Sequence, residues 1–262
     1  MTPLSEEYVA RFDGLARLYG RDALTRLAGL HVAVVGLGGV GSWAAEALAR
    51  SGVGRLTLID GDTVATSNIN RQLPALSSTL GEGKHTVLAR RLRDINPECR
   101  IHTVDAYLTE DNLATLLAPE TPLDGVIDAI DGIRHKAALI HGCRRRRLPI
   151  VATGGAGGLR DPAAITVADL SRTHHDPLAS KVRRRLRDVY GFSRNPRRRF
   201  GVECVFSTEQ PVYPRADGST GPEKPGVHGL HLDCHMGYGA AVFITAPFGF
   251  MAVGKLLERL SR

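Results

Sequence analysis

The chain has 262 residues, which is enough for one large domain with a sizeable core. Its 43% hydrophobic and 23% charged residues exclude a fibrous or disordered protein and indicate an ordinary soluble one. The four cysteines form no C-x-x-C pair, which argues against a disulfide scaffold and against a four-cysteine zinc site. The first residues lack the order of a signal peptide, so we expect a cytoplasmic protein.

The net charge of +7 is unevenly distributed along the chain. Residues 134–199 hold 17 Lys and Arg against four Asp and Glu, whereas the remainder is mildly acidic. A basic region attached to an acidic one predicts a polyanionic partner.

From the first strand to residue 160, short apolar runs alternate with amphipathic segments. The predicted strands are 31–35, 56–59, 101–104, 126–130 and 150–153, and the predicted helices are 42–51, 84–95, 112–117 and 136–146. This alternation predicts an α/β fold with a Rossmann-like, doubly wound and mostly parallel sheet, covered on both faces.

The pattern weakens after residue 160, where we expect a C-terminal extension of the same domain. It predicts a strand at 165–170, a helix at 177–189 and surface loops over 194–225. The uncharged stretch 236–254 predicts a buried closing helix broken near Pro247, with membrane association as the less favoured alternative. The expected organisation is a helical segment (1–30), an ATP-binding core (31–160) and a basic substrate region with the closing helix (161–262).

A glycine-rich turn follows the first predicted strand, with glycines at Gly36, Gly38, Gly39 and Gly41. Gly36 permits a tight turn, Gly38 allows phosphate to approach the backbone, and Gly41 lets the next helix pack on the strand. Asp60 ends the next strand, where a carboxylate can accept hydrogen bonds from ribose. These features alone suit a nicotinamide or flavin enzyme equally well.

A polar cluster beyond Asp60 favours a nucleoside triphosphate. Negative charge that develops on a pyrophosphate leaving group calls for Arg and Lys, and Mg²⁺ calls for a carboxylate. The residues that meet these needs are Asp62, Asn68, Arg71, Lys84 and, after the fourth strand, Asp131. Taken singly, Arg71 and Lys84 would be solvated surface charges, and Asp131 would cap the next helix. Their joint placement predicts a site for ATP and Mg²⁺.

The segments GLGGVGSWAAEALARSGVG, LTLIDGD, SNINRQ, GEGK and DAIDGIRHKAALI resemble the superfamily of ubiquitin-like-protein-activating enzymes, which includes bacterial activators of sulfur-carrier proteins. Within it, RFDGLARLYG, NRQLPAL, ATGGAGG, DPLASKVRRRLR and CVFSTE are similar to the bacterial tRNA threonylcarbamoyladenosine dehydratases.

The resemblance implies roles for the matching positions. The glycines would hold the phosphates, Asp60 the ribose, and Asp131 the Mg²⁺, while Asn68, Arg71 and Lys84 would contact the triphosphate. It also implies a homodimer in which an N-terminal arginine reaches the partner's site; Arg17 is slightly favoured over Arg11. The implied reaction adenylates the threonyl carboxylate of the modified adenosine at position 37 of tRNA and cyclises it, with release of AMP and pyrophosphate.

Two other functions stay open. An activator of the C-terminal glycine of a ubiquitin-like sulfur-carrier protein would usually carry two C-x-x-C zinc pairs, which are absent here. A nicotinamide-dependent oxidoreductase or a non-catalytic scaffold would have no need of Arg71 and Lys84. Cys204 and Cys234 read as buried thiols, and His231 and His235 lack the glutamate of the metalloprotease pattern.

The basic region is rich in arginines. They would either form solvated helix surfaces or contact the backbone of an RNA, and we favour the second interpretation. The helix around 181–187 is expected to carry charge on all sides. Tyr190, Phe192 and Phe200 would either stack on bases or fill a core. The candidate RNA contacts are Arg144, Arg145, Arg146, Arg183, Arg184, Arg185, Arg197 and Arg198.

Overall fold

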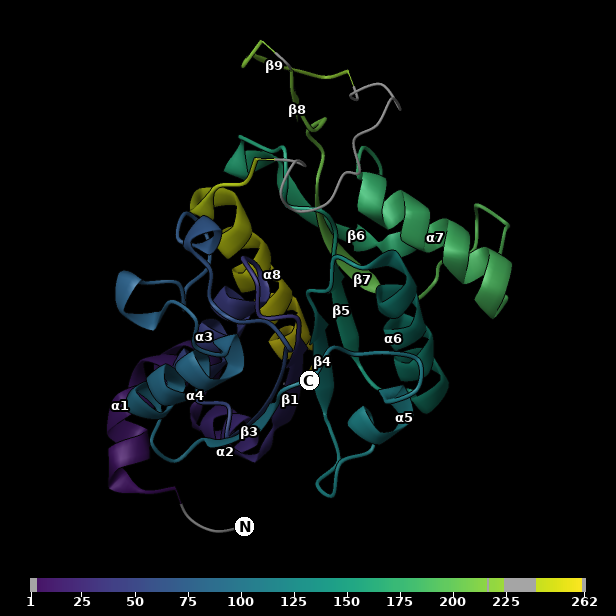
Figure 1. The fold of residues 1–262 in the computed structure, drawn as a ribbon. Helices are drawn as coiled ribbons and strands as arrows, with labels where there is room; N and C mark the ends of the chain where they lie inside the picture. The colour runs from purple at the N-terminus through teal and green to yellow at the C-terminus, as the bar shows by residue number, and fades with distance from the viewer. Residues whose placement is uncertain (1–3, 216, 224–238, 261–262) are drawn as a thin grey trace.

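A seven-stranded sheet forms the centre of the computed structural model, which describes residues 4–215, 217–223 and 239–260 (Figure 1). The strand order is β3-β2-β1-β4-β5-β7-β6, and every neighbouring pair is parallel except β6 and β7. The predicted Rossmann-like, mostly parallel sheet is confirmed. The strands are β1 (His31–Val35), β2 (Arg55–Ile59), β3 (Arg100–Val104), β4 (Gly125–Asp128), β5 (Ile150–Thr153), β6 (Ile165–Asp169) and β7 (Glu203–Ser207).

Helices cover both faces of the sheet, as the sequence predicts. Alternate residues of β1 point to opposite faces. Val32 and Val34 pack with α3, α4 and α8, whereas Ala33 and Val35 pack with α6 and α7. The helices are α1 (Glu6–Tyr19), α2 (Arg21–Gly29), α3 (Gly41–Arg50), α4 (Lys84–Ile95), α5 (Leu113–Leu116), α6 (Ile133–Arg146), α7 (Pro177–Tyr190) and α8 (Val242–Leu260).

The first two helices form a small cluster of their own at the amino-terminal edge of the sheet. Tyr8 and Phe12 of α1 pack with Leu24 of α2. The Tyr8 hydroxyl donates a hydrogen bond to the carbonyl of Gly52, which lies in the turn before β2. This edge is opposite the carboxyl ends of the strands, so α1 lies away from the loops that follow β1 and β4.

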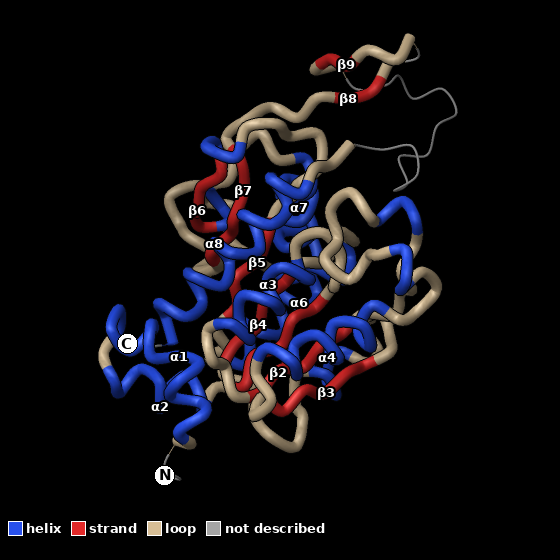
Figure 2. Tube along the Cα trace, turned by 90° about the vertical axis from the view of Figure 1, so that its left-hand side faces the viewer, coloured by secondary structure: helices blue, strands red, loops and turns tan. Residues whose placement is uncertain are grey.

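The surface loops predicted over 194–225 contain a strand that the sequence analysis missed. β7 is inserted between β5 and β6 and is buried from Cys204 to Ser207. Its apolar run is only three residues long and is surrounded by Arg, Gly and Glu, so the sequence pattern is weak. Two further short strands, β8 (Tyr213–Pro214) and β9 (Thr220–Gly221), pair in a hairpin that stands away from the sheet (Figure 2).

The prediction of a closing helix broken near Pro247 is wrong. α8 runs without interruption through Pro247 to Leu260. The missing N–H of the proline removes one hydrogen bond, but Ile244, Phe248, Ala252 and Leu256 are all buried on one side of the helix and hold it against the sheet. None of the helices in the described ranges is long and apolar enough to cross a membrane.

We expect the packing of α8 to dominate the stability of this face. Phe248 is 0% exposed, so Phe248→Ala should lower the free energy of unfolding by about 3–5 kcal/mol and the melting temperature by about 2–4 °C per kcal/mol. Phe243, on the same helix and 56% exposed, provides the matched control: Phe243→Ala should change stability little. Thermal and urea unfolding of both variants measure this; equal effects would show that α8 is not held by its buried face.

Candidate nucleotide site

The turn after β1, residues 36–41 (the glycine loop), is closed by contacts that no side chain would permit. Gly36 has a φ of +86°, and a Cβ on it would lie 2.8 Å from the carbonyl oxygen of Ala129. A Cβ on Gly41 would lie 1.7 Å from the carbonyl oxygen of Gly36. Gly36 and Gly41 are therefore required by the protein's own backbone packing.

Gly38 differs from the other two glycines. Among the described atoms, a Cβ there would come no nearer to another group than 3.8 Å, the distance to Nε2 of Gln72. The fold itself has room for a side chain at this position. The space in front of Gly38 suits a phosphate that approaches the backbone at the N-terminus of α3.

α8 supports the glycine loop from one side, which sequence reasoning did not foresee. A Cβ on Gly249 would lie 2.6 Å from the carbonyl oxygen of Val40, so the two backbones are in close contact. Thr245 packs against Gly39, and its Oγ1 lies 3.5 Å from the carbonyl oxygen of Arg71. The same carbonyl accepts a hydrogen bond of 3.0 Å from Nε1 of Trp43. These contacts fix Arg71 relative to the loop.

Asp60 lies at the end of β2 and holds the glycine loop directly. Its Oδ2 accepts a hydrogen bond from the backbone N–H of Leu37 at 2.5 Å, and its Oδ1 accepts one from Asp62 at 2.8 Å. Burial raises the pKa of the Asp60 carboxyl, although these hydrogen bonds oppose the rise. A carboxylate has about four acceptor positions, so capacity for ribose hydroxyls is left.

Lys84 is a buried cation beside this turn. Its side chain is 5% exposed, and its Nζ lies 2.8 Å from Oδ2 of Asp62. Burial alone would raise the pKa of the Asp62 carboxyl, but the hydrogen bonds from Lys84 and from the hydroxyl of Tyr107 lower it below its usual value. The Asp62 carboxylate therefore stays ionised beside Lys84. Tyr107 is a member of the site that no sequence motif indicated.

The segment after β2 brings Asn68 and Arg71 to the same region. The Oδ1 of Asn68 accepts a hydrogen bond of 3.1 Å from the N–H of Ala65, which shapes the turn. Nη1 of Arg71 donates to the carbonyl of Ser67 at 2.8 Å and to Oδ1 of Asn70 at 2.9 Å. Gln72 is buried next to Gly38, and its Oε1 has no hydrogen-bond partner within the described ranges.

A buried ion pair positions the loop that carries Asp131. β4 ends at Asp128, two residues earlier than predicted, and the exposed Asp131 lies in the loop before α6. Nζ of Lys136 lies 3.0 Å from Oδ1 of Asp128 and also donates to the carbonyl of Ile130 at 2.8 Å. Burial raises the pKa of the Asp128 carboxyl, and Lys136 opposes this. The lysine ties strand and loop together, a role that its place in an amphipathic helix did not reveal.

The basic surface lies on α6, α7 and the following loop. The charge does not surround α7 evenly as expected, because Ala179, Val182 and Leu186 are buried and Arg183 donates to Oγ1 of Thr173. Burial lowers the pKa of Arg183. The predicted RNA contacts that remain exposed are Arg144, Arg145, Arg146, Arg184, Arg197 and Arg198, and Arg185 is half-buried.

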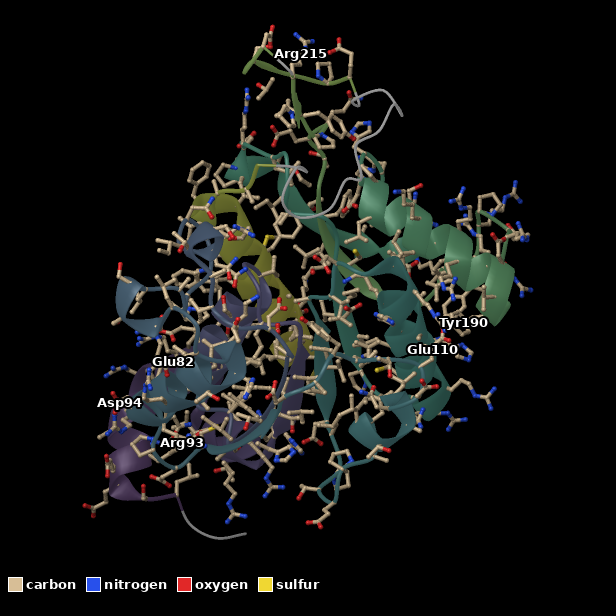
Figure 3. The ribbon with its side chains drawn as sticks, viewed as in Figure 1. Glu82, Arg93, Asp94, Glu110, Tyr190 and Arg215 are labelled. Atoms are coloured by element: carbon tan, nitrogen blue, oxygen red, sulfur yellow. The ribbon has the colours of Figure 1, made fainter. Side chains whose placement is uncertain are left out.

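Glu110 joins this basic surface to the body of the protein. Its carboxylate lies 2.6 Å from Nη2 of Arg134, 3.4 Å from Nη2 of Arg185 and 3.1 Å from the hydroxyl of Tyr190 (Figure 3). The hydrogen bond from Arg134 is the main cause that lowers the pKa of Glu110 to about 2. The three contacts connect α6 and α7 to the loop after β3.

The aromatic residues near the arginines fill the core rather than project from it. Phe200 is 4% exposed and packs edge-on against Phe192, and Tyr190 stacks on His141. Cys204 is also buried, as expected, and burial raises the pKa of its thiol. Cys234, His231 and His235 lie outside the described residues. Among the described residues, no group of three His, Cys, Asp or Glu is arranged to hold a metal ion.

The model of the ThiF family matches residues 13–260.

The chain belongs to the ThiF family.

The chain is 50% identical over 258 residues to the tRNA threonylcarbamoyladenosine dehydratase of Escherichia coli, with 98% of this chain and 96% of that protein covered. A crystal structure of that E. coli enzyme in complex with ATP superposes with a TM-score of 0.88 at 48% identity, covering 99% of this chain and 97% of the other. The molybdopterin-synthase adenylyltransferase of E. coli is more distant, at 35% identity over 169 residues, 64% of this chain and 66% of that protein.

The glycine loop allows a test that separates folding from ligand binding. Gly41→Ala should destabilise the protein by about 1–3 kcal/mol or more, because its Cβ would overlap the Gly36 carbonyl. Gly38→Ala should leave thermal stability nearly unchanged but weaken ATP binding by about 10–200-fold, because the methyl group occupies the space of a phosphate. Thermal unfolding and ATP titration of both variants measure this. Unchanged ATP affinity in Gly38→Ala would contradict the role of this loop.

Proposed function

We propose that this protein is an ATP-dependent tRNA threonylcarbamoyladenosine dehydratase. The observation that carries the proposal is the buried Lys84, ion-paired with Asp62, next to a glycine loop with room for phosphate at Gly38. A cation fixed there stabilises negative charge on a leaving pyrophosphate. The 50% identity to the E. coli dehydratase over nearly the whole chain supports the choice of substrate.

In this proposal the nucleotide lies across the carboxyl ends of β2, β1 and β4. The N-terminus of α3 and the backbone of the glycine loop hold the phosphates, and Asp60 accepts from the ribose. Asn68, Arg71 and Lys84 contact the triphosphate, and Asn68 also shapes the turn that precedes Arg71.

The reaction has two steps. The threonyl carboxylate attacks the α-phosphorus of ATP, and the bond to pyrophosphate breaks, which gives an acyl-adenylate. The neighbouring carbamoyl group then attacks the acyl carbon, the bond to AMP breaks, and the carbamoyl group gives up a proton. One carboxylate oxygen of the substrate leaves with AMP, and the proton comes from the carbamoyl group, so the substrate loses one water overall. The chain contributes positioning and charge stabilisation.

The residues present fit a bound Mg²⁺, although no group of three His, Cys, Asp or Glu in the described part of the chain could hold a metal ion by itself. Magnesium is commonly held by one or two carboxylates together with substrate phosphates and waters. The exposed Asp131, on a loop fixed by Lys136, is the candidate ligand. When bound, the ion would neutralise charge on the phosphates.

The tRNA would contact the basic surface on α6, α7 and residues 194–199. Lysines and arginines there neutralise backbone phosphates and position the RNA without reading its sequence. The region 161–262, together with α6, would then be the substrate side of one domain, and the rest of 31–160 the ATP side. A cytoplasmic location agrees with a tRNA substrate.

A homodimer is also part of the proposal, with Arg17 reaching into the partner's site. α1 packs at the amino-terminal edge of its own sheet, opposite the glycine loop. The Arg17 side chain is 76% exposed and forms an exposed ion pair with Asp13, whereas that of Arg11 is 37% exposed and bonded to Glu7. Leu18 and Tyr19 beside it are 69% and 62% exposed, which suits an interface.

Activation of a sulfur-carrier protein is the second candidate. The distant similarity to an adenylyltransferase of E. coli favours shared adenylation chemistry. The extensive basic surface disfavours this alternative, because it suits a polyanionic substrate.

The decisive test is mass analysis of tRNA nucleosides after incubation with the protein, ATP and Mg²⁺. We expect threonylcarbamoyladenosine to lose one water, with one AMP formed per modified nucleoside. Lys84→Met should lower kcat/KM about 100-fold or more, whereas Lys255→Met on α8 should leave it unchanged. Equal AMP formation with unmodified tRNA, or adenylation of a carrier protein instead, would refute the proposal.

The proposed dimer predicts complementation between two inactive variants. Arg17→Ala and Lys84→Met should each lose activity, and a mixture allowed to exchange subunits should regain part of it, because one site then combines two intact contributions. Arg11→Ala serves as the control and should keep most of its activity. Absence of recovery in mixtures that native mass spectrometry of differently tagged subunits shows to contain mixed dimers would contradict the shared site.

A further inference from the structure

A recess that is open to solvent lies at the carboxyl edge of the sheet, where β5 and β7 end and α7 begins. Three segments distant in the sequence line it, and they are the ones in which ATGGAGG, DPLASK and CVFSTE occur. The lining residues are Gly155, Gly157, Leu159, His175, Asp176, Pro177, Leu178, Ser207, Glu209 and Pro211.

Buried hydrogen bonds hold the walls of the recess in place. Asp176 is 6% exposed; its Oδ1 accepts from the N–H of Ala179 at 2.8 Å and its Oδ2 from the N–H of Gly155 at 3.0 Å. On the other side, Glu209 accepts from the N–H of Arg160 at 2.9 Å and Ser207 Oγ accepts from the N–H of Glu209 at 3.1 Å. The carboxylates therefore fix the backbone, and the recess is preformed.

The chemistry of the lining differs from that of the basic surface. Leu159, Pro177, Leu178 and Pro211 give it apolar walls, its two carboxylates are acceptors, and none of the described lining residues is Lys or Arg. A phosphate or a free carboxylate would be repelled there. A flat, uncharged group with N–H and O–H donors would be accepted.

The position of the recess fits a neighbour of the ATP site. β5 lies two strands from β1 in the sheet, a separation of about 10 Å at the usual strand spacing. A ligand whose uncharged part lies in the recess can place its own carboxylate away from Asp176 and Glu209 and toward Lys84 and Arg71.

We propose that this recess binds the adenine base and carbamoyl link of the modified nucleoside, and so selects tRNA that carries the threonylcarbamoyl group. The inference rests on the proposed function and specifies its acceptor site. The basic surface binds the RNA backbone, and the recess recognises the modified nucleoside.

A larger side chain at Gly155 would fill part of the recess without disturbing the fold. A Cβ there would lie 3.7 Å from Oδ1 of Asp176 and from Cβ of Leu178, which is ordinary contact, so Gly155→Ala should fold normally. We expect it to lower kcat/KM for modified tRNA by about 10-fold or more, and Gly155→Val to lower it further, with ATP affinity unchanged. Gly29→Ala, at a position with open space around it, is the matched control.

A binding measurement makes the test independent of turnover. Equilibrium dialysis with labelled threonylcarbamoyladenosine nucleoside, in the presence of saturating ATP, should show binding to the wild-type protein and to Gly29→Ala and its loss in Gly155→Val. Binding that Gly155→Val retains, or a wild-type kcat/KM in Gly155→Ala, would overturn the recess as the acceptor site. No tRNA-dependent AMP formation by the wild-type protein would instead overturn the proposed function, and the dialysis result would still decide the recess.

Discussion

The close approach of three backbone segments at the end of β1 is the constraint on which the site depends. The carbonyl of Gly36 lies where a side chain of Gly41 would be, the carbonyl of Ala129 crowds Gly36, and α8 approaches Val40 through Gly249. These contacts bring the start of α3, the end of β4 and the last helix to one point. The unsatisfied N–H groups of α3 consequently face the edge of the sheet where the strands end, which is where ligands bind in open α/β folds.

Two ion pairs complete this edge, and both involve a buried lysine. Lys84 pairs with Asp62, and Lys136 pairs with Asp128 beneath the loop of Asp131. Buried ion pairs contribute little net stability, because desolvation offsets their attraction. Their value here is positional: one holds a cation at the nucleotide's side of the sheet, and the other holds a carboxylate-bearing loop opposite it.

The part of the chain from α6 onward carries two surfaces with different chemistry. The exposed arginines of α6 and α7 form a positive surface that suits a phosphate backbone, and Glu110 fastens this surface to the rest of the fold. The recess at β5, β7 and α7 is apolar and lined by carboxylates. Contacts to phosphates position a nucleic acid, whereas contacts to a base select it. The two surfaces therefore suit a division between holding the RNA and recognising the modified nucleoside.

The sequence by itself determined the alternation of strands and helices from β1 to β5 and the place of the glycine loop, because short apolar runs, period-3.6 patterns and glycine turns are local properties. It also predicted Lys84 at the start of α4. The sequence pattern did not reveal β7, because a three-residue apolar run becomes a strand only when β5 and β6 lie on either side. The continuity of α8 through Pro247, the hydrogen bond from Arg183 to Thr173, and the pairing of Lys136 with Asp128 were decided by tertiary structure alone. Each depends on neighbours distant in the chain, and packing against them outweighs what the local residues prefer.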